Sequence, residues 1–197
     1  MRKIFIAVLI LFIGHYVAGQ SQRFGVKAGA NLFILSSSND KTMDYSTGKV
    51  GYTIGGTYVV FLNKSFSIQP ELNYSYQEAR EEYYGSTIKV AYTQVPILAR
   101  FHPANAKIAL YAGPQVGFLG SAKIKEENGT ETGVAGQLNQ TDLGIAFGLA
   151  TVPVNKNITF DLRVYRGLMN VFKSEFDGGI TSRPTLITIT VGYLFGK

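Results

Sequence analysis

Cysteine is absent from all 197 residues of the chain. This absence excludes disulfide bonds, lipid attachment through an N-terminal cysteine, thiolate metal sites and cysteine nucleophiles. Tryptophan is absent too, although the aromatic belts at membrane interfaces often contain it. The net charge of +6 comes from basic residues that form no cluster, so binding to nucleic acid has no support.

No apolar run in the chain reaches the roughly 18 residues that a membrane-spanning helix needs. The run 4–13 follows two basic residues, Arg2 and Lys3, and is followed by the small residues of 17–19. These three regions are typical of a secretory signal peptide. We therefore expect a signal peptide over 1–19 and one exported domain over 20–197.

Polar and apolar residues alternate almost without fault over 65–77. Such alternation predicts a two-faced β-strand, and its length exceeds the roughly 9–11 tilted residues that cross a bilayer's hydrocarbon layer. Similar segments recur along the chain. The expected strands are 23–33, 49–62, 65–77, 88–102, 107–120, 141–152, 158–169 and 185–196.

The connections between these strands alternate in length. Long polar connections are expected at 34–48, 78–87, 121–140 and 170–184, and short ones at 63–64, 103–106 and 153–157. This alternation is typical of an outer-membrane barrel with short periplasmic turns and longer extracellular loops. The fold class predicted is therefore all-β, an eight-stranded antiparallel up-and-down transmembrane β-barrel with both termini in the periplasm.

Charge placement indicates which face of the barrel meets lipid. A secreted soluble barrel of the lipocalin kind also has eight strands with one apolar face, but it displays many charges on its outer strand faces. Here ten of the 13 acidic residues lie in the expected long loops, and the other three, Glu71, Asp142 and Asp161, lie in the polar phase of a strand. We expect the apolar phase to face lipid and the polar phase to face the lumen.

Two features depart from a simple alternation. In the fourth strand the apolar phase changes near Thr93, which predicts a bulge there or a start above the membrane. Three prolines, Pro70, Pro96 and Pro114, each remove a hydrogen-bond donor from the ladder, so bulges or rim positions are expected at them.

The sequence offers one candidate functional cluster, a set of charged residues in the polar phase of the strands. In a narrow lumen such charges must pair, which predicts an ionic plug that rigidifies the barrel; the alternative is a path for a substrate or an ion. The interior of an eight-stranded barrel is just wide enough for side chains to fill. The predicted lumenal network consists of Lys27, Glu71, Arg100, Asp142, Asp161 and Arg163.

Catalytic, metal and cofactor sites are not expected. Some small outer-membrane barrels act on lipid acyl chains with a histidine at the outer leaflet, but the exported domain has one histidine, His102, in a short turn at the predicted periplasmic rim. One histidine and scattered carboxylates supply no ligand spacing for zinc, and the paired glutamates lack a calcium-loop pattern.

Six motifs lie at 24–31, 69–74, 94–97, 111–114, 142–148 and 191–195. Together they resemble the outer-membrane β-barrel proteins of the PorT-like family of Bacteroidetes-type bacteria. The resemblance covers the whole mature chain and implies an outer-membrane location and an eight-stranded barrel; the eponymous member is associated with a protein-secretion apparatus. The ending 193–195 also resembles the aromatic signal that the barrel-assembly machinery reads, although Gly196 and Lys197 follow it here.

These observations predict a non-enzymatic outer-membrane protein with a structural or interaction role through its extracellular loops, especially 121–140, and with a possible link to protein secretion. The expected partners are outer-membrane lipid, the barrel-assembly machinery during biogenesis, and a protein bound at the loops. A small-solute pore is the first alternative. A lipid-modifying enzyme is the second.

Overall fold

The computed structural model describes residues 21–37, 47–80, 86–104, 106–151, 157–173, 175 and 181–195. The predicted signal peptide, 1–19, lies outside these residues. Within the described ranges, no helix is long and apolar enough to span a membrane. The strands found there are β1 (Gln22–Ser37), β2 (Thr47–Phe61), β3 (Phe66–Arg80), β4 (Thr87–Phe101), β5 (Ile108–Lys125), β6 (Glu131–Gly133), β7 (Thr141–Thr151), β8 (Ile158–Gly167) and β9 (Ser182–Phe195).

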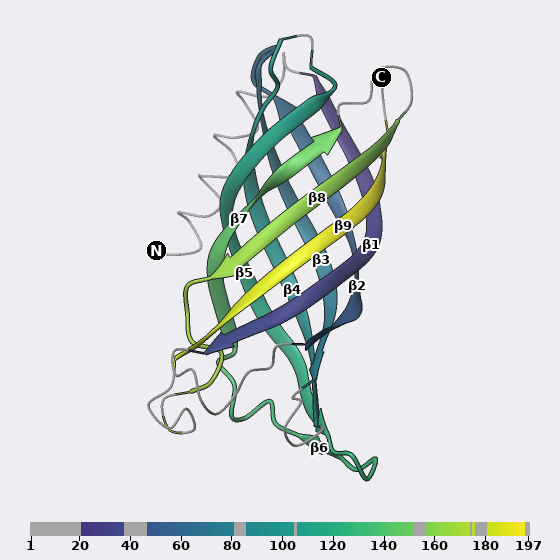
Figure 1. Ribbon diagram of the computed structural model, residues 1–197. Coiled ribbons are helices and arrows are strands. Elements are labelled where there is room, and N and C mark those ends of the chain that lie inside the picture. The colour runs from purple at the N-terminus through teal and green to yellow at the C-terminus, as the bar shows by residue number, and fades with distance from the viewer. Residues whose placement is uncertain are drawn as a thin grey trace, which may run out of the picture.

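Eight of these strands close into an antiparallel barrel, which confirms the predicted fold class. The barrel strands follow one another in chain order, and β1 pairs with β9 to close the ring. The short strand β6 pairs with the end of β5 and is not part of the ring. Figure 1 shows the tilted strands around a common axis, with β6 projecting beyond them at one end. Because the ring is closed, each of its eight strands is paired with a neighbouring strand on both sides.

At the end of the barrel with short turns, every strand begins or ends within one residue of its predicted position. At the opposite end, which we call the loop end, several strands continue further than predicted: β1 reaches Ser37, β3 reaches Arg80 and β5 reaches Lys125. In the extensions of β3 and β5 the outward residues Glu78, Arg80, Lys123 and Lys125 are charged, so no outward apolar residue marks them. The connection 81–86 is consequently no longer than the turn 102–107.

The apolar phase of the strands faces outward, as predicted. Leu72 on β3 and Ile189 on β9 are each 60% exposed, whereas the polar residues that alternate with Leu72 are buried. A protein in water hides side chains of this kind, and a contiguous apolar surface that surrounds a closed barrel suits lipid instead. The wall therefore has the polarity of a membrane barrel.

Of the two explanations expected for the phase change in the fourth strand, the bulge within that strand near Thr93 is wrong. Ile88, Val90 and Tyr92 on β4 are buried on the lumen side, so the strand keeps a single phase. The lumen changes instead, since it is polar in its middle and apolar near the loop end. A bulge does lie beside this segment, but its extra residue is Gly120 of β5, opposite the Ala91–Tyr92 bond.

The prediction that prolines mark bulges or rim positions is also wrong. Pro70 lies opposite Ile97, and the β3–β4 register is unchanged further along, where Asn73 lies opposite Gln94. The β4–β5 register likewise has no shift near Pro96. Each proline removes one donor, and the remaining bonds of a closed ladder hold the register.

Candidate functional site

Three strands that are distant in sequence bring a charged cluster into the middle of the lumen. Nζ of Lys27 on β1 lies 2.7 Å from Oε2 of Glu71 on β3. Arg163 on β8 donates from both terminal nitrogens to the two carboxylate oxygens of Glu71, each at 2.8 Å. All three residues are at least nine-tenths buried. Such a two-bonded arginine–carboxylate pair fixes both distance and orientation.

Neighbouring side chains on β3 complete the coordination of the Glu71 carboxylate. Gln69 and Asn73 lie two residues to either side and share its face of the strand. Gln69 Nε2 donates to Oε1 at 2.6 Å, and Asn73 Nδ2 donates to Oε2 at 2.9 Å. With Lys27 and Arg163, these amides supply several donors to one buried carboxylate, which offsets the loss of its hydration.

The cluster continues around the lumen through three further residues. Arg100 on β4 donates to Oε1 of Gln69. Asp161 on β8 lies 3.7 Å from the Arg163 guanidinium. The Tyr111 hydroxyl accepts a hydrogen bond of 3.2 Å from Nε of Arg163, and the guanidinium lies 5.3 Å from the centre of the Tyr111 ring.

The structure brings together five of the six residues in the predicted network and leaves Asp142 apart. Asp142 lies nearer the loop end, where its carboxylate accepts a bond of 2.6 Å from the Tyr165 hydroxyl. Sequence reasoning did not single out Gln69, Asn73 or Tyr111. The two amides were detectable as inward neighbours of Glu71, whereas Tyr111 lies among apolar residues of its strand and carried no polar signal.

A second buried polar layer lies on the loop side of the charged cluster. Asn31 Nδ2 donates to Thr53 Oγ1 at 2.9 Å and to Ser75 Oγ at 3.2 Å. Gln77 Nε2 donates to the same Ser75 hydroxyl at 3.0 Å. These uncharged groups bridge β1, β2 and β3 inside the lumen.

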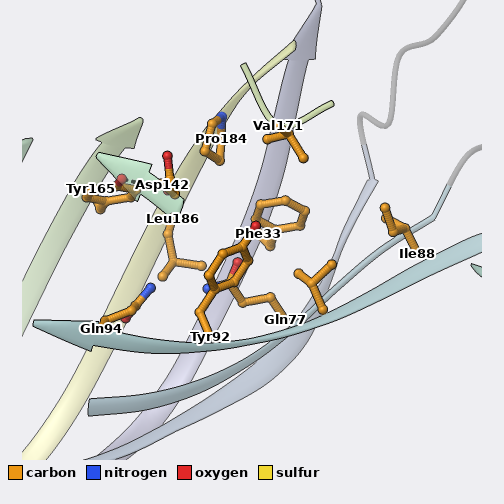
Figure 2. Close-up of a pocket in the computed structure, with 11 residues that line it drawn as sticks. Phe33, Gln77, Ile88, Tyr92, Gln94, Asp142, Tyr165, Val171, Pro184 and Leu186 are labelled. Carbon is orange, nitrogen blue, oxygen red and sulfur yellow. Dashed lines mark hydrogen bonds between the residues drawn. The ribbon is translucent and has the colours of Figure 1, made fainter. Parts of the chain in front are cut away.

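Beyond this layer the lumen becomes apolar. Figure 2 shows Phe33, Ile88 and Leu186 around a small cavity, with Asp142 and Tyr165 at its side. The cavity has a volume of about 10 Å³, which is room for about one water molecule. Around this point, side chains therefore fill the loop end of the lumen. The space left between them is no larger than one water molecule.

Parts of two connections, 134–140 and 168–173, fold over the apolar end of the lumen. Leu138 is fully buried and Val171 is 7% exposed. Asn139 joins the two connections because its side-chain amide donates to the carbonyl oxygens of Asn170 at 2.8 Å and Phe172 at 3.1 Å. We call these joined segments, 134–140 and 168–173, the loop cap.

His102 lies at the opposite end of the barrel, in the turn after β4. Its Nε2 is 2.8 Å from the Ser67 hydroxyl, and partial burial, assisted by the charge of Arg100, lowers the pKa of the imidazole. The short-turn position is the one expected from the sequence. In the described part of the chain, no group of three or more histidine and carboxylate side chains is arranged to hold a metal ion.

Two of the solved structures similar to this chain come from Neisseria and from Yersinia pestis. Neisserial surface protein A is 15% identical, with a TM-score of 0.58 over 87% of this chain and 97% of that one. Ail, the attachment invasion locus protein of Yersinia pestis, in complex with the heparin analogue sucrose octasulfate, is 15% identical, with a TM-score of 0.52 over 89% of this chain and 99% of that one. At this identity the likeness concerns the fold.

A search of the curated proteins found no match. The family model described as outer membrane protein beta-barrel domain matches residues 18–173. This stretch contains the charged cluster, the outward apolar wall of β1 to β8 and the whole loop cap. The chain therefore belongs to the outer membrane protein β-barrel domain family.

Proposed function

We infer that the protein is a closed outer-membrane barrel without enzymatic activity, and that it acts through the surface at its loop end. The observation that carries this inference is the filled lumen. A carboxylate bound by Lys27 and Arg163 lies across its middle, and the loop cap covers the end where solutes would enter. A structural plug accounts for these groups better than a solute path does.

The loop end faces the cell exterior in this proposal, with both termini in the periplasm. The position of the longer connections supports this orientation, since outer-membrane barrels carry short turns on the periplasmic side. Export by a signal peptide over 1–19 and folding by the barrel-assembly machinery belong to the same proposal.

The surface offered to a partner is built from the loop cap and the hairpin formed by β5 and β6. The hairpin tip, 126–130, is exposed and turns at Gly129, whose φ is +89°. A partner protein bound there would be recruited from the surroundings or from the envelope. Recruitment into a secretion complex is the narrower form of this proposal, and it rests on the resemblance to the PorT-like family alone.

The proposed absence of catalysis rests on the position of the exported domain's one histidine. The His102 imidazole is bonded to Ser67 at the short-turn end, where it is separated by the barrel from any lipid site in the outer leaflet. A lipid-modifying reaction there would need another base. Incubation of the refolded protein with phospholipid and lipid A, followed by mass spectrometry of the lipids, should show no change.

Conductance separates the plugged barrel from the rival small-solute pore. Purified protein in planar bilayers is expected to give no sustained current steps. A porin reconstituted under identical conditions serves as the positive control. Reproducible current steps that are absent from a refolded closed barrel would favour the small-solute pore over the plugged barrel.

Orientation is tested with cysteines, because the chain has no thiol of its own. Glu127→Cys lies at the exposed hairpin tip and Lys64→Cys in an exposed short turn. A membrane-impermeant maleimide should label the first on intact cells and the second only after lysis. Labelling of Lys64→Cys alone would show that the barrel has the opposite orientation. Recovery of both variants in the soluble fraction would exclude a location in the membrane.

A further inference from the structure

One flank of the barrel carries a basic surface immediately beyond the lipid-facing wall. At the loop end of β2, β3, β4 and β5, the outward positions change from apolar and aromatic to charged. Figure 1 shows that β5 and β6 extend past the ends of β8 and β9 on this side. The basic face consists of Lys49, Arg80, Lys89, Lys123 and Lys125.

The register of the sheet arranges these residues in two rows. Lys49 lies opposite Glu78, Glu78 opposite Lys89, and Lys89 opposite Lys123. With strands about 4.8 Å apart, this first row spans about 14 Å across four strands. Arg80 and Lys125 lie in the second row, separated by Thr87.

The β2–β3 half of the first row lies just above two stacked aromatic rings. The rings of Tyr52 and Tyr76 stack at 5.3 Å between centroids, one outward step below Lys49 and Glu78. From Phe66 to Tyr76, β3 covers about 33 Å, which at the usual strand tilt corresponds to an apolar band about 25 Å tall. This is the height of the lipid-facing band in outer-membrane barrels, so the basic face begins where lipid headgroups begin.

The two carboxylates in these rows, Glu78 and Glu131, neutralise only part of the rows' charge. Glu131 lies 2.6 Å from the Lys89 amine and 3.6 Å from that of Lys123. Glu78 accepts a bond of 2.8 Å from the Tyr76 hydroxyl. The two rows thus hold five cations and two carboxylates, and Glu126 and Glu127 lie beyond the rows, at the exposed hairpin tip. Both lysines of β5 remain exposed.

We propose that the basic face binds the phosphate groups of an anionic glycolipid in the outer leaflet of the membrane. The apolar wall below it contacts the acyl chains of the same lipid, so one molecule satisfies both surfaces. Lysine side chains suit this level because their apolar stems lie along the wall while the ammonium groups reach the headgroups. This inference rests on the proposed orientation, since the loop end must meet the phosphorylated leaflet.

Two double variants, one in the basic face and one at the short-turn end, test whether the basic face binds the lipid. Lys123→Gln with Lys125→Gln removes two exposed charges from it, and Lys64→Gln with Lys107→Gln removes two exposed charges from the short-turn end. Each refolded protein is titrated in uncharged micelles with diphosphorylated lipid A, and in parallel with dephosphorylated lipid A. Sucrose octasulfate serves as a soluble polyanion without acyl chains.

We expect the first pair to weaken binding of diphosphorylated lipid A by about 30-fold, because each basic residue near an anionic headgroup contributes about a factor of five. The short-turn pair should bind like the parent, and dephosphorylated lipid A should bind all three proteins weakly. Added salt should reduce the difference.

Equal losses in both pairs, or equal binding of both lipid A forms, would overturn the glycolipid site. Tighter binding of sucrose octasulfate than of diphosphorylated lipid A would assign the basic face to a soluble polyanion instead. In micelles neither leaflet is defined, so these outcomes test the site independently of orientation. Failure of the proposed orientation would appear only in the labelling of intact cells.

Discussion

Arg163 and Glu71 face each other across the lumen and are joined by two hydrogen bonds of 2.8 Å. They are 92 residues apart in sequence and belong to β8 and β3, which are not neighbours in the barrel. Lys27 binds the same carboxylate from β1. Side chains therefore connect parts of the ring that backbone hydrogen bonds do not connect.

Replacing the central carboxylate should destabilise the barrel strongly. Glu71→Ala leaves Lys27 and Arg163 buried without their counterion, and we expect it to lower the free energy of unfolding by about 3–5 kcal/mol. Urea unfolding in micelles, followed by far-ultraviolet circular dichroism, measures this change. Glu126→Ala removes an exposed carboxylate and should stay within about 0.5 kcal/mol of the parent. Equal stability of the two variants would contradict the plug, and neither should conduct ions.

Because the outward wall faces lipid in this proposal, the loss of stability caused by a charge on it should depend on its depth in the membrane. Leu72→Arg places a charge on the middle of the wall and should lower stability by about 2–4 kcal/mol, whereas Leu62→Arg, at the short-turn end, should lower it by about 0–1 kcal/mol. The fraction of folded protein after refolding into vesicles is read from heat-modifiable gel migration. Identical folding of the two variants would show that residue 72 does not face lipid.

His102 should give the barrel a weak acid sensitivity. Burial, and secondly Arg100, holds the pKa of its imidazole below 6.5 in the folded protein. The unfolded chain therefore binds this proton more tightly. Stability is full above about pH 6.5 and falls as the pH drops below that value.

His102→Gln should remove that part of the pH dependence. Ser67→Ala should retain it, since the imidazole stays in place. Unfolding midpoints measured between about pH 5 and about pH 8 compare the three proteins. Superimposable pH profiles of the parent and His102→Gln would assign any acid sensitivity to other groups.

The loop cap should loosen when its connecting amide is removed. Asn139→Ala loses the bonds to the carbonyls of Asn170 and Phe172, which we expect to lower the local opening free energy by about 2 kcal/mol. Hydrogen exchange within 134–140 and 168–173 should become faster, while strands β1 to β3 remain protected. Asn128→Ala, at the hairpin tip, is the matched control. Unchanged exchange in Asn139→Ala would show that packing alone holds the cap.

The short-turn ends of the strands were predictable because apolar outward residues continue to the last pair there. At the loop end, Arg80 and Lys125 still pair in the sheet although they resemble loop residues in sequence, so periodicity placed those ends too early. The buried residues Ile88 and Val90 caused a different error in the sequence interpretation. They looked like a phase change because apolar residues fill that end of the lumen.

The members of the charged cluster were predictable from phase, but their mutual distances were not. Glu71 and Arg163 are inward residues in any eight-stranded closure, yet their contact depends on the stagger of eight strands. Asp142 shows the difference, because its phase is equally inward and it lies at another height, beside Tyr165. Alternation assigns a side chain to a face, and register assigns it to a partner.

The unequal heights of the two flanks have a consequence for how these molecules meet one another within the membrane plane. Strand β5 continues to Lys125 and carries β6 beyond it, whereas β8 ends at Gly167. A barrel of uniform height would present the same rim in every direction. Among the described strands, β5 and β6 extend past the ends of β8 and β9, so lateral encounters between barrels should depend on their rotation about the membrane normal. Crowding should therefore favour associations in which the barrels have a defined rotation relative to one another.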